Sequence, residues 1–343
     1  MEILDASNQL SPWSAPRDPD LIFPMRSYEK LLLDLGWEDP LAWLQHWIER
    51  GAVNLAYSAW PPNIRTDWLW GLGLPFLSDL EQYIATQEHQ IILGISGLPG
   101  CGKTSFGKWI EAAAVELDWS VSVMSMDDFY LPGTQLDQAM AGNPWNVPRG
   151  LPGSHSIDLF EQTIDTWMKK GDLCAPQFDK ALRNGRGDRS GWRLTSPKIL
   201  VIEGWFLGCA TTHLDSYNVS IVNESTPPLL ISEYEYRSVV QASLERYQFL
   251  WKKFGRIWHL KASEFNATSL WKSQQEMNMQ EERGASLKGK SLDSFIRMIQ
   301  TSIPKRCLQS IDCSVVAQLS RSREITWVGT KATETLMEEK TTS

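Results

Sequence analysis

Residues 90–109 read QIILGISGLPGCGKTSFGKW and combine three local patterns in a fixed order. An apolar, β-branched run over 91–95 predicts a buried strand, and a helical pattern follows Ser105. Between them, residues 97–104 (GLPGCGKT) satisfy G-x-x-x-x-G-K-[ST] at every fixed position. A strand before the glycine-rich loop and a helix after it distinguish a phosphate-binding loop from a chance match. The stretch therefore predicts a nucleoside triphosphate site and not a plain glycine turn.

The residue types of this loop explain how it would bind phosphate. Glycines at 97, 100 and 102 allow positive φ and a close approach of the backbone to phosphate oxygens. Successive N–H groups then form an anion-binding nest, to which the next helix adds its N-terminal donors. We expect Lys103 to reach the β- and γ-phosphates and Thr104 to bind Mg²⁺ through its hydroxyl. The predicted nucleotide-binding residues are Gly97, Leu98, Pro99, Gly100, Cys101, Gly102, Lys103, Thr104 and Ser105.

Composition and charge exclude several classes of protein. The 343 residues are 42% hydrophobic, the formal net charge is −8 and the pI is near 5.3, so a broad nucleic-acid-binding surface is not expected. Five cysteines without a C-x-x-C spacing are typical of reduced thiols in a cytosolic protein. The opening residues, MEILDASNQLSPW, do not resemble a signal or transit peptide, and no apolar run is long enough to span a membrane. These features predict a cytoplasmic protein.

The chain divides into three expected parts. Residues 1–88 predict a small helical segment, residues 89–330 an α/β domain, and residues 331–343 a polar tail. The first segment is rich in tryptophan, and its rings form either a core that docks it on the next domain or an aromatic ligand surface. These tryptophans are Trp37, Trp43, Trp47, Trp60, Trp68 and Trp70.

Strands and helices alternate from residue 89 onward. This alternation favours a mostly parallel sheet flanked by helices, with the phosphate loop at its carboxyl edge. Further strands are expected over 120–125, 198–202, 219–222, 314–319 and 324–328, and helices over 103–117, 158–169 and 233–280. The polar stretches 131–154 and 175–197 are expected to be irregular.

Acidic residues follow two of the expected strands. Asp127 and Asp128 come directly after the strand over 120–125, where a phosphoryl-transfer enzyme needs a carboxylate to accept a proton or to hold a metal-bound water. We predict Asp127 as the base and Asp128 in a supporting role; the alternative is an Asp pair that caps a turn. Glu203 ends the apolar run 199–202, and a buried carboxylate there needs a cation such as Mg²⁺ beside Thr104. The alternative for Glu203 is a helix cap.

Basic residues in the two irregular stretches predict a pocket for an anionic acceptor, because guanidinium groups pair with carboxylates. Solvated loop charge is the alternative for any one of them. The candidates are Arg149, Lys180, Arg183, Arg186 and Arg189, with His155 as a further acceptor ligand. A lid over the phosphates, or simply a charged helix face, is expected from Arg237, Arg246, Lys252, Lys253 and Arg256.

The phosphate loop, Asp127-Asp128-Phe129-Tyr130 and Ile202-Glu203-Gly204 together resemble the phosphoribulokinase/uridine kinase family of small-molecule kinases. Longer stretches resemble the D-glycerate 3-kinases of plant and cyanobacterial type within it. These are SMDDFYLPGTQ (125–135), GNPWNVPRGLPGSHSIDLF (142–160), PQFDKALRNGRGDRSGW (176–192) and VIEGWFLG (201–208). The resemblance covers about 89–330 and leaves the first 88 residues unmatched.

The resemblance implies ATP- and Mg²⁺-dependent phosphorylation of D-glycerate to 3-phosphoglycerate, the closing step of photorespiratory carbon salvage. It also implies a catalytic carboxylate at Asp127 and metal-side acidity at Glu203. Two alternatives stay open: a kinase for another small acceptor, such as pantothenate, a nucleoside or a sugar phosphate, and a nucleotide-dependent regulatory module. The stretches 131–155 and 176–193 would discriminate between acceptors.

Overall fold

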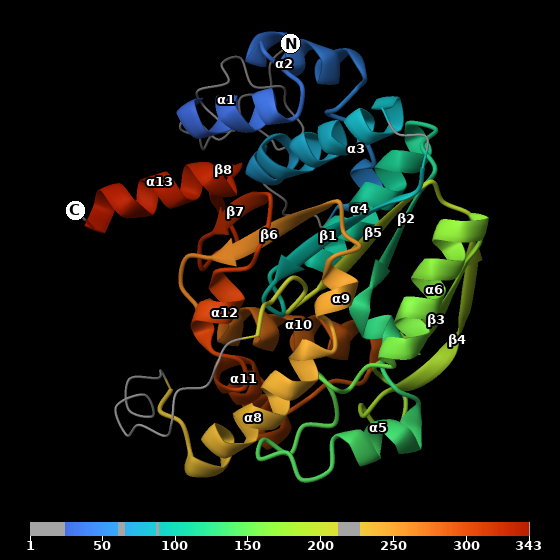
Figure 1. The fold of residues 1–343 in the computed structure, drawn as a ribbon, viewed down its shortest axis with the longest axis vertical. Helices are drawn as coiled ribbons and strands as arrows, with labels where there is room; N and C mark the ends of the chain where they lie inside the picture. Colours follow the sequence, from blue (N-terminus) through green and yellow to red (C-terminus); the bar gives the residue numbers. More distant parts are fainter. Residues whose placement is uncertain (1–24, 61–65, 87–88, 212–226, 343) are drawn as a thin grey trace.

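Six strands form the central sheet of the computed structural model, which describes residues 25–60, 66–86, 89–211 and 227–342 (Figure 1). The strand order is β2-β5-β1-β6-β7-β8. All neighbouring pairs are parallel except β7 and β8. The strands are β1 (Ile91–Gly97), β2 (Val121–Ser125), β5 (Ile199–Gly204), β6 (Arg256–Ala262), β7 (Val315–Leu319) and β8 (Ile325–Thr330). β1 and β5 are apolar along most of their length because the sheet is buried on both faces.

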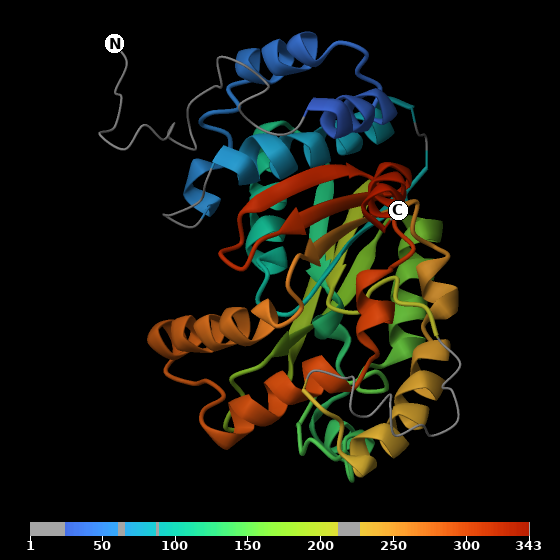
Figure 2. The ribbon, with the colours of Figure 1, turned by 90° about the vertical axis from the view of Figure 1, so that its left-hand side faces the viewer.

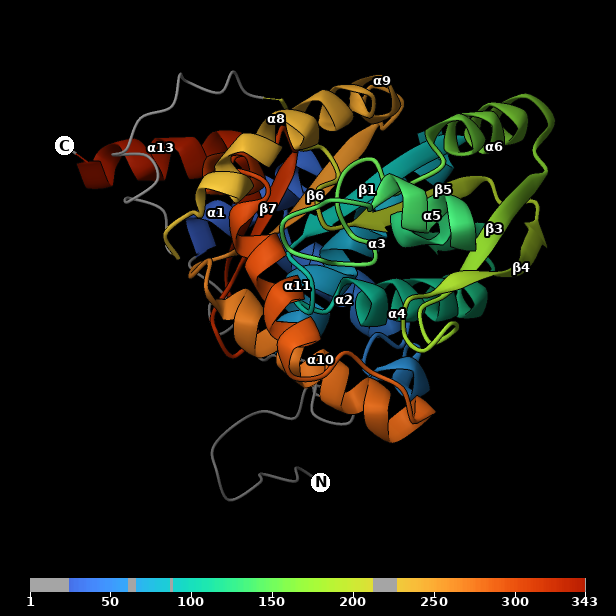
Figure 3. The same cartoon turned by 90° about the horizontal axis from the view of Figure 1, so that it is seen from below.

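Helices cover both faces of the sheet. Seen from below, α3 (Leu74–Thr86) and α4 (Lys103–Glu116) lie on one face, and α6 (Ile157–Lys170) and α9 (Gln248–Trp251) lie on the other (Figure 3). The remaining helices of this part are α5 (Gly133–Ala139), α8 (Ile231–Glu245), α10 (Ala267–Arg283), α11 (Lys290–Thr301) and α12 (Lys305–Gln309). α10 and α11 pack against each other, away from the N-terminal helices (Figure 2). The predicted fold class, a mostly parallel sheet flanked by helices, is confirmed.

Several predicted elements are also confirmed. The strands expected over 120–125 and 198–202 are β2 and β5, and the pair expected near the end is the antiparallel β7 and β8. The helices expected over 103–117 and 158–169 are α4 and α6. The strand expected over 219–222 lies outside the described residues.

Three predictions of secondary structure are wrong. The stretch 131–154, expected to be irregular, contains α5 (Gly133–Ala139). The stretch 175–197 is largely a hairpin of β3 (Leu173–Asp179) and β4 (Asp188–Thr195), which pair antiparallel in a sheet of their own. The stretch 233–280 is interrupted by β6, which lies in the middle of the main sheet. These three strands were not predicted because polar residues dominate their surroundings, and cross-strand pairing outweighs local propensity there.

The N-terminal segment packs its tryptophans into the same core as the sheet. It contains α1 (Met25–Asp34), α2 (Pro40–Glu49), a 3₁₀ turn η2 (Tyr57–Ala59), a π-helical stretch η3 (Asp67–Gly73) and α3. Trp43 and Trp47 both donate to Ser78 Oγ, at 2.8 and 2.9 Å, and Trp70 is fully buried. These three tryptophans are core, as the docking interpretation predicts.

The C-terminal residues are helical where the structure describes them. α13 (Lys331–Thr342) buries Glu334, which pairs with Lys261 and Lys331 at 2.7 Å each, so the start of the predicted polar tail is anchored to the sheet. Within the described ranges, no helix has the length and apolar character needed to cross a membrane.

A buried carboxylate attaches α3 to β6. Asp79, which is fully buried, accepts from Trp258 Nε1 at 2.8 Å and lies 3.5 Å from Arg256 Nε. Arg256 also pairs with Asp34 at 2.7 Å, which ties α1 to the same strand. Burial raises the pKa of Asp79 to about 6, although Arg256 and Trp258 oppose the shift.

The raised pKa of Asp79 predicts a pH dependence of stability. The folded protein binds this proton more tightly than the unfolded chain does. The contribution of Asp79 protonation to the free energy of unfolding is therefore complete below about pH 4 and is lost as the pH rises through about 6. Replacing the residue, Asp79→Asn, removes the titration. Between pH 5 and pH 7.5 we expect the stability of the variant relative to the parent to rise by about 1 kcal/mol, measured by urea unfolding. A difference that does not change with pH would contradict the prediction.

Candidate active site

The phosphate loop joins β1 to α4 at the carboxyl edge of the sheet. Gly100 and Gly102 have φ of +78° and +115°, the left-handed region that favours glycine. Gly97 is different, because it does not have positive φ. A Cβ at Gly97 would instead lie 2.9 Å from the carbonyl oxygen of Leu260 on β6, so close packing requires glycine there.

Two parts of the chain that are distant in sequence pack closely against this loop. A Cβ at Gly100 would lie 2.6 Å from the carbonyl group of Trp271 on α10, and one at Gly102 would lie 2.8 Å from Cη2 of Trp68 on η3. Arg323, in the turn between β7 and β8, donates from Nε to the carbonyl of Gly100 at 2.8 Å. The loop is therefore held between α10, the N-terminal segment and the last hairpin.

Lys103 and Thr104 begin α4 directly beside the loop. Lys103 is buried, and its Nζ donates to the carbonyls of Gly97 (2.7 Å) and Leu98 (3.1 Å), which holds the ammonium above the loop. Thr104 Oγ1 donates to Glu203 Oε1 at 2.8 Å. Glu203 lies next to Ile95 of β1 and Ser125 of β2 in register, so three parallel strands end around one point.

The chemistry of these oxygens fits Mg²⁺. Thr104 and Glu203 place a hydroxyl and a buried carboxylate within hydrogen-bond distance of each other, next to the phosphate loop. No group of three or more acidic, His or Cys side chains that could hold a metal occurs among the described residues. Mg²⁺ in kinases is bound by one or two protein oxygens together with substrate phosphates and waters, so such a group is not required.

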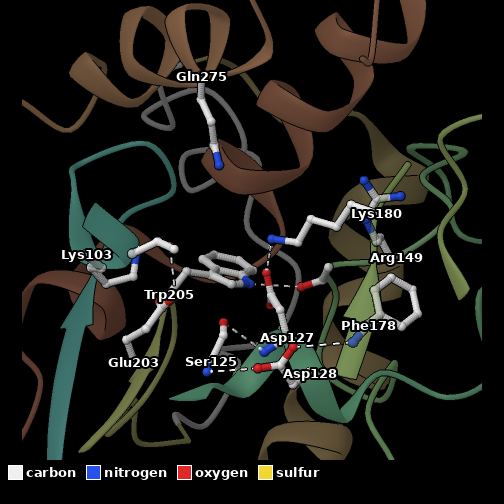
Figure 4. Close-up of polar contacts among 12 residues, drawn as sticks. Lys103, Ser125, Asp127, Asp128, Arg149, Phe178, Lys180, Glu203, Trp205 and Gln275 are labelled. Carbon is white, nitrogen blue, oxygen red and sulfur yellow. Dashed lines mark hydrogen bonds and ion pairs between the residues drawn. The ribbon is translucent and has the colours of Figure 1, made fainter. Parts of the chain in front are cut away.

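Asp127 follows β2, in the 3₁₀ turn η4 (Met126–Phe129). Its Oδ2 accepts from Lys180 Nζ at 2.6 Å, and Figure 4 shows both side chains meeting in the middle of the site. Burial by itself would raise the pKa of Asp127, but the Lys180 ammonium and the nearby His155 lower it well below its usual range. Asp127 is therefore an ionised acceptor of hydrogen bonds at neutral pH.

Asp128 points away from Asp127 and connects two elements. Its carboxylate accepts from the backbone N–H of Ser125 (3.1 Å) and of Phe178 on β3 (3.3 Å) (Figure 4). Burial raises the pKa of Asp128 to about 6, although these two N–H donors oppose the shift. The residue does not line the cavity described below, and it holds the β3–β4 hairpin to the end of β2. The contacts of Asp128 agree with the alternative given above, in which an aspartate caps a turn.

His155 lies behind Asp127. Its Nδ1 is 2.9 Å from the hydroxyl of Tyr247, and its Nε2 is 3.9 Å from Asp127 Oδ1, which is too long for a hydrogen bond. Burial lowers the pKa of His155, although Asp127 opposes the shift, so the ring is neutral at neutral pH. The ring does not line the cavity, and the structure places it as support for Asp127.

A cavity of about 510 Å³ joins these groups. The phosphate loop, Thr104, Asp127 and Glu203 line it from the sheet side, and α10 lines it from the opposite side. Other lining residues, which sequence reasoning did not select for the site, are Tyr130, Trp205, Lys272, Gln274, Gln275, Asn278, Phe295, Ser322 and Arg323. Tyr130 and Trp205 lie in stretches that carry the family resemblance, whereas the others have no motif around them and only the fold reveals them.

Among the basic candidates, the structure brings two to the cavity. Arg149 is buried, and its Nη1 donates to the carbonyls of Gly185 (2.6 Å) and Arg186 (2.9 Å) while the residue lines the cavity. Lys180 lines it as well. Arg183 and Arg186 instead pair with Asp137, and Arg189 donates to the carbonyl of Tyr130; none of these three lines the cavity.

The predicted lid cations also lie elsewhere. Arg237 donates to the carbonyl of Thr301, Lys253 pairs with Asp165, and Arg256 pairs with Asp34 and Asp79. Neither these residues nor Arg246 and Lys252 line the cavity that the described residues form. The helix that does cover the cavity is α10, from which Gln275 points toward Lys180 and Asp127 (Figure 4). Lys272, one turn earlier, is buried and pairs with Glu276 at 2.6 Å.

Comparison with known proteins identifies relatives of this chain. No family model matches the chain. The chain is 28% identical over 246 residues to the uncharacterized kinase mug58 of Schizosaccharomyces pombe, across 67% of this chain and 84% of that protein. It is 26% identical over 219 residues to the chloroplastic D-glycerate 3-kinase of Arabidopsis thaliana, across 60% of this chain and 45% of that protein. The match therefore spans less than half the length of the Arabidopsis protein.

A solved structure of D-glycerate 3-kinase from Cryptococcus neoformans has the same fold, with a TM-score of 0.61 and 21% identity over 74% of this chain and 96% of that chain. The chain has the fold of a P-loop kinase. Its relatives are named kinases and include D-glycerate 3-kinase, so the predicted resemblance is confirmed. The roles of the individual site residues stay predictions.

The close packing at Gly100 predicts that one added methyl group there weakens ATP binding, whereas a methyl group at an uncrowded glycine does not. Gly100→Ala places Cβ against the backbone of Trp271, so the loop must move, and we expect ATP affinity to fall about tenfold or more in calorimetric titration. Gly142→Ala is the matched control, because Gly142 has φ of +75° but no atom within 4 Å of an added Cβ. The control should lose about 1 kcal/mol of stability and keep its ATP affinity. Equal losses of affinity in both variants would contradict the prediction.

Proposed function

We propose that this protein is an ATP- and Mg²⁺-dependent kinase that phosphorylates D-glycerate to 3-phosphoglycerate. The observation that carries the proposal is the placement of an ionised carboxylate, Asp127, in one cavity with the phosphate loop and two cations, Arg149 and Lys180. D-glycerate as the acceptor is supported by the names of the relatives in Arabidopsis and Cryptococcus and by the small anion that two cations would suit.

The donor end of the site would bind ATP through the loop. The backbone N–H groups after Gly97 and the N-terminus of α4 would bind the phosphates, and the Lys103 ammonium would reach the β- and γ-phosphates. Thr104 and Glu203 would hold Mg²⁺, which when bound neutralises part of the charge on the phosphates. Only 6% of Glu203 is exposed, so its charge interacts more strongly with a bound cation than it would in bulk water.

The acceptor end would bind glycerate between Asp127, Lys180 and Arg149. The glycerate carboxylate would pair with the guanidinium of Arg149 and the ammonium of Lys180. Its primary hydroxyl would then donate a hydrogen bond to Asp127, which orients the oxygen toward the γ-phosphorus. Trp205 also lines the cavity, and its Nε1 donates to the carbonyl of Gly150 at 3.0 Å (Figure 4).

The transfer itself would be an in-line displacement. A bond forms between the hydroxyl oxygen and the γ-phosphorus, the bond from that phosphorus to the β–γ bridging oxygen breaks, and the hydroxyl proton passes to Asp127. The low pKa of Asp127 agrees with a loose transition state, in which the proton is given up late and orientation matters more than basicity. Lys103 and the cations facing the cavity take up the charge that develops on the phosphoryl oxygens.

The direct test of the proposal is ATP-dependent product formation from D-glycerate, with the phosphate position determined by ³¹P and ¹³C NMR. Formation of 3-phosphoglycerate is expected. Phosphorylation of pantothenate, a nucleoside or a sugar phosphate in its place would assign another acceptor to the same site, and nucleotide binding without any acceptor would favour a regulatory module. A place in photorespiratory carbon salvage rests on the plant relative alone and is part of the proposal.

The role of Asp127 makes a prediction about catalysis. Asp127→Asn keeps the shape of the side chain but removes the proton acceptor, so we expect kcat to fall about 10²- to 10⁴-fold while the Kd for ATP changes less than about threefold. Asp137→Asn is the control, because Asp137 is also paired with basic side chains but does not line the cavity. A comparable loss of ATP affinity in Asp127→Asn would count against its role as base.

The two arginines of the acceptor stretches allow a paired test of specificity. Arg149→Lys replaces a buried guanidinium that lines the cavity with an ammonium. We expect the KM for D-glycerate to rise about tenfold with little change in the KM for ATP. Arg186→Lys changes a residue whose guanidinium pairs with Asp137 outside the cavity, and it should leave both KM values nearly unchanged. Steady-state kinetics that show the reverse order would place the carboxylate contact at Arg186.

A further inference from the structure

Two tryptophans of the N-terminal segment reach the cavity. Trp60 and Trp68 both line it, although only 6% and 7% of their surfaces are exposed. Their rings meet edge to face, with centroids 6.3 Å apart and an interplanar angle of 78°. Trp60 also stacks on Trp109 of α4 at 4.7 Å, so the pair is fixed to the helix that follows the phosphate loop.

Contacts place this pair beside the loop. Trp68 approaches Gly102 through Cη2, and its Nε1 donates to the carbonyl of Arg323 at 2.7 Å. Arg323 in turn donates to Gly100, as described above. The tryptophans therefore line the cavity where the loop meets the turn between β7 and β8.

The strand order separates this region from the acceptor end. Asp127 follows β2 and Glu203 lies at the end of β5, on one side of β1, whereas Arg323 follows β7, on the other side. A nucleoside triphosphate is a linear chain, with the γ-phosphate at one end and the base at the other. If the γ-phosphate faces Asp127, the base extends toward Trp60, Trp68 and Arg323.

We infer that Trp60 and Trp68 form the wall against which the nucleoside base binds, so that the N-terminal segment is part of the nucleotide site. Aromatic side chains are suited to this because nucleobases stack on them or meet them edge to face in a cavity that excludes water. The inference rests on the proposed binding of ATP at the phosphate loop. It assigns a function to a segment that lies outside the resemblance found in the sequence.

A purely structural role for the pair predicts a different result. If Trp68 only supports the loop at Gly102, its removal weakens the binding of any phosphate chain, whether or not a base is attached. If Trp68 contacts the base, its removal weakens ATP and leaves inorganic tripolyphosphate, which has the phosphates but no base, almost unaffected. The ratio of the two dissociation constants separates the roles.

The experiment is isothermal titration of the full chain with Mg-ATP and with Mg-tripolyphosphate, for the parent, Trp60→Leu, Trp68→Leu and Trp70→Leu. Leucine keeps an apolar side chain but has no aromatic face. Trp70 is the matched control, because it lies in the same π-helical stretch and is fully buried away from the cavity. Each ratio compares two ligands on one sample, so a reduced folded fraction cancels.

We expect Trp68→Leu and Trp60→Leu to raise the Kd for ATP about tenfold more than they raise the Kd for tripolyphosphate, and Trp70→Leu to leave the ratio unchanged. An unchanged ratio in both cavity variants, or the same change of ratio in Trp70→Leu, would overturn the inference. The titrations need no acceptor. A parent that binds ATP but does not phosphorylate D-glycerate would therefore refute the proposed reaction without touching this inference.

Discussion

The close packing around Gly100 and Gly102 is the constraint on which the rest of the site depends. The loop must expose its N–H groups to phosphate, and this requires a backbone that only glycine adopts easily. The space that side chains would occupy is filled by Trp271 from α10 and Trp68 from η3. The conformation of the loop is thus fixed by elements that come from before it and far after it in the chain.

Arg323 shows how this arrangement is held together. Its backbone carbonyl accepts from Trp68, its Nε donates to Gly100, and its Nη2 donates to the carbonyl of Trp271 at 3.3 Å. One residue in a turn therefore connects the N-terminal segment, the phosphate loop and the helix that covers the cavity. Its own φ of +63° places it among the few non-glycine residues with left-handed backbone, a strain that is tolerated where the surrounding contacts determine the conformation.

The sequence predicted the parts of the site that follow strands and could not predict the parts that only tertiary packing brings there. Lys103, Thr104, Asp127 and Glu203 stand next to motifs or at the ends of apolar runs, and parallel strands bring such positions to one edge. Gln275 has no local signal, because a glutamine in a polar helix is common. Arg186 was a candidate for the acceptor pocket but does not line the cavity, because the density of charge within a stretch does not tell which side chains face inward.

The elements of the fold also divide into those with a local sequence pattern and those that depend on tertiary pairing. β1, β5 and α4 have strong local patterns, whereas the β3–β4 hairpin is half-exposed and carries few β-branched residues. β6 lies between the helices α9 and α10, so the helical pattern around it concealed a strand at the centre of the sheet. Its place there depends on pairing with β1 and β7, which local sequence does not encode.

The contacts between the two ends of the chain have a consequence for how the protein folds. Asp67 accepts from the backbone N–H of Ile325 at 2.6 Å, and α1 packs beside β8, so segments more than 250 residues apart in sequence complete each other. During synthesis the tryptophan-rich N-terminal helices emerge first, yet the last hairpin on which they dock is made near the end. Non-local contacts of this kind slow folding, because the chain must close long loops before they form. The aromatic side chains of the N-terminal helices therefore stay exposed until the β7–β8 hairpin forms.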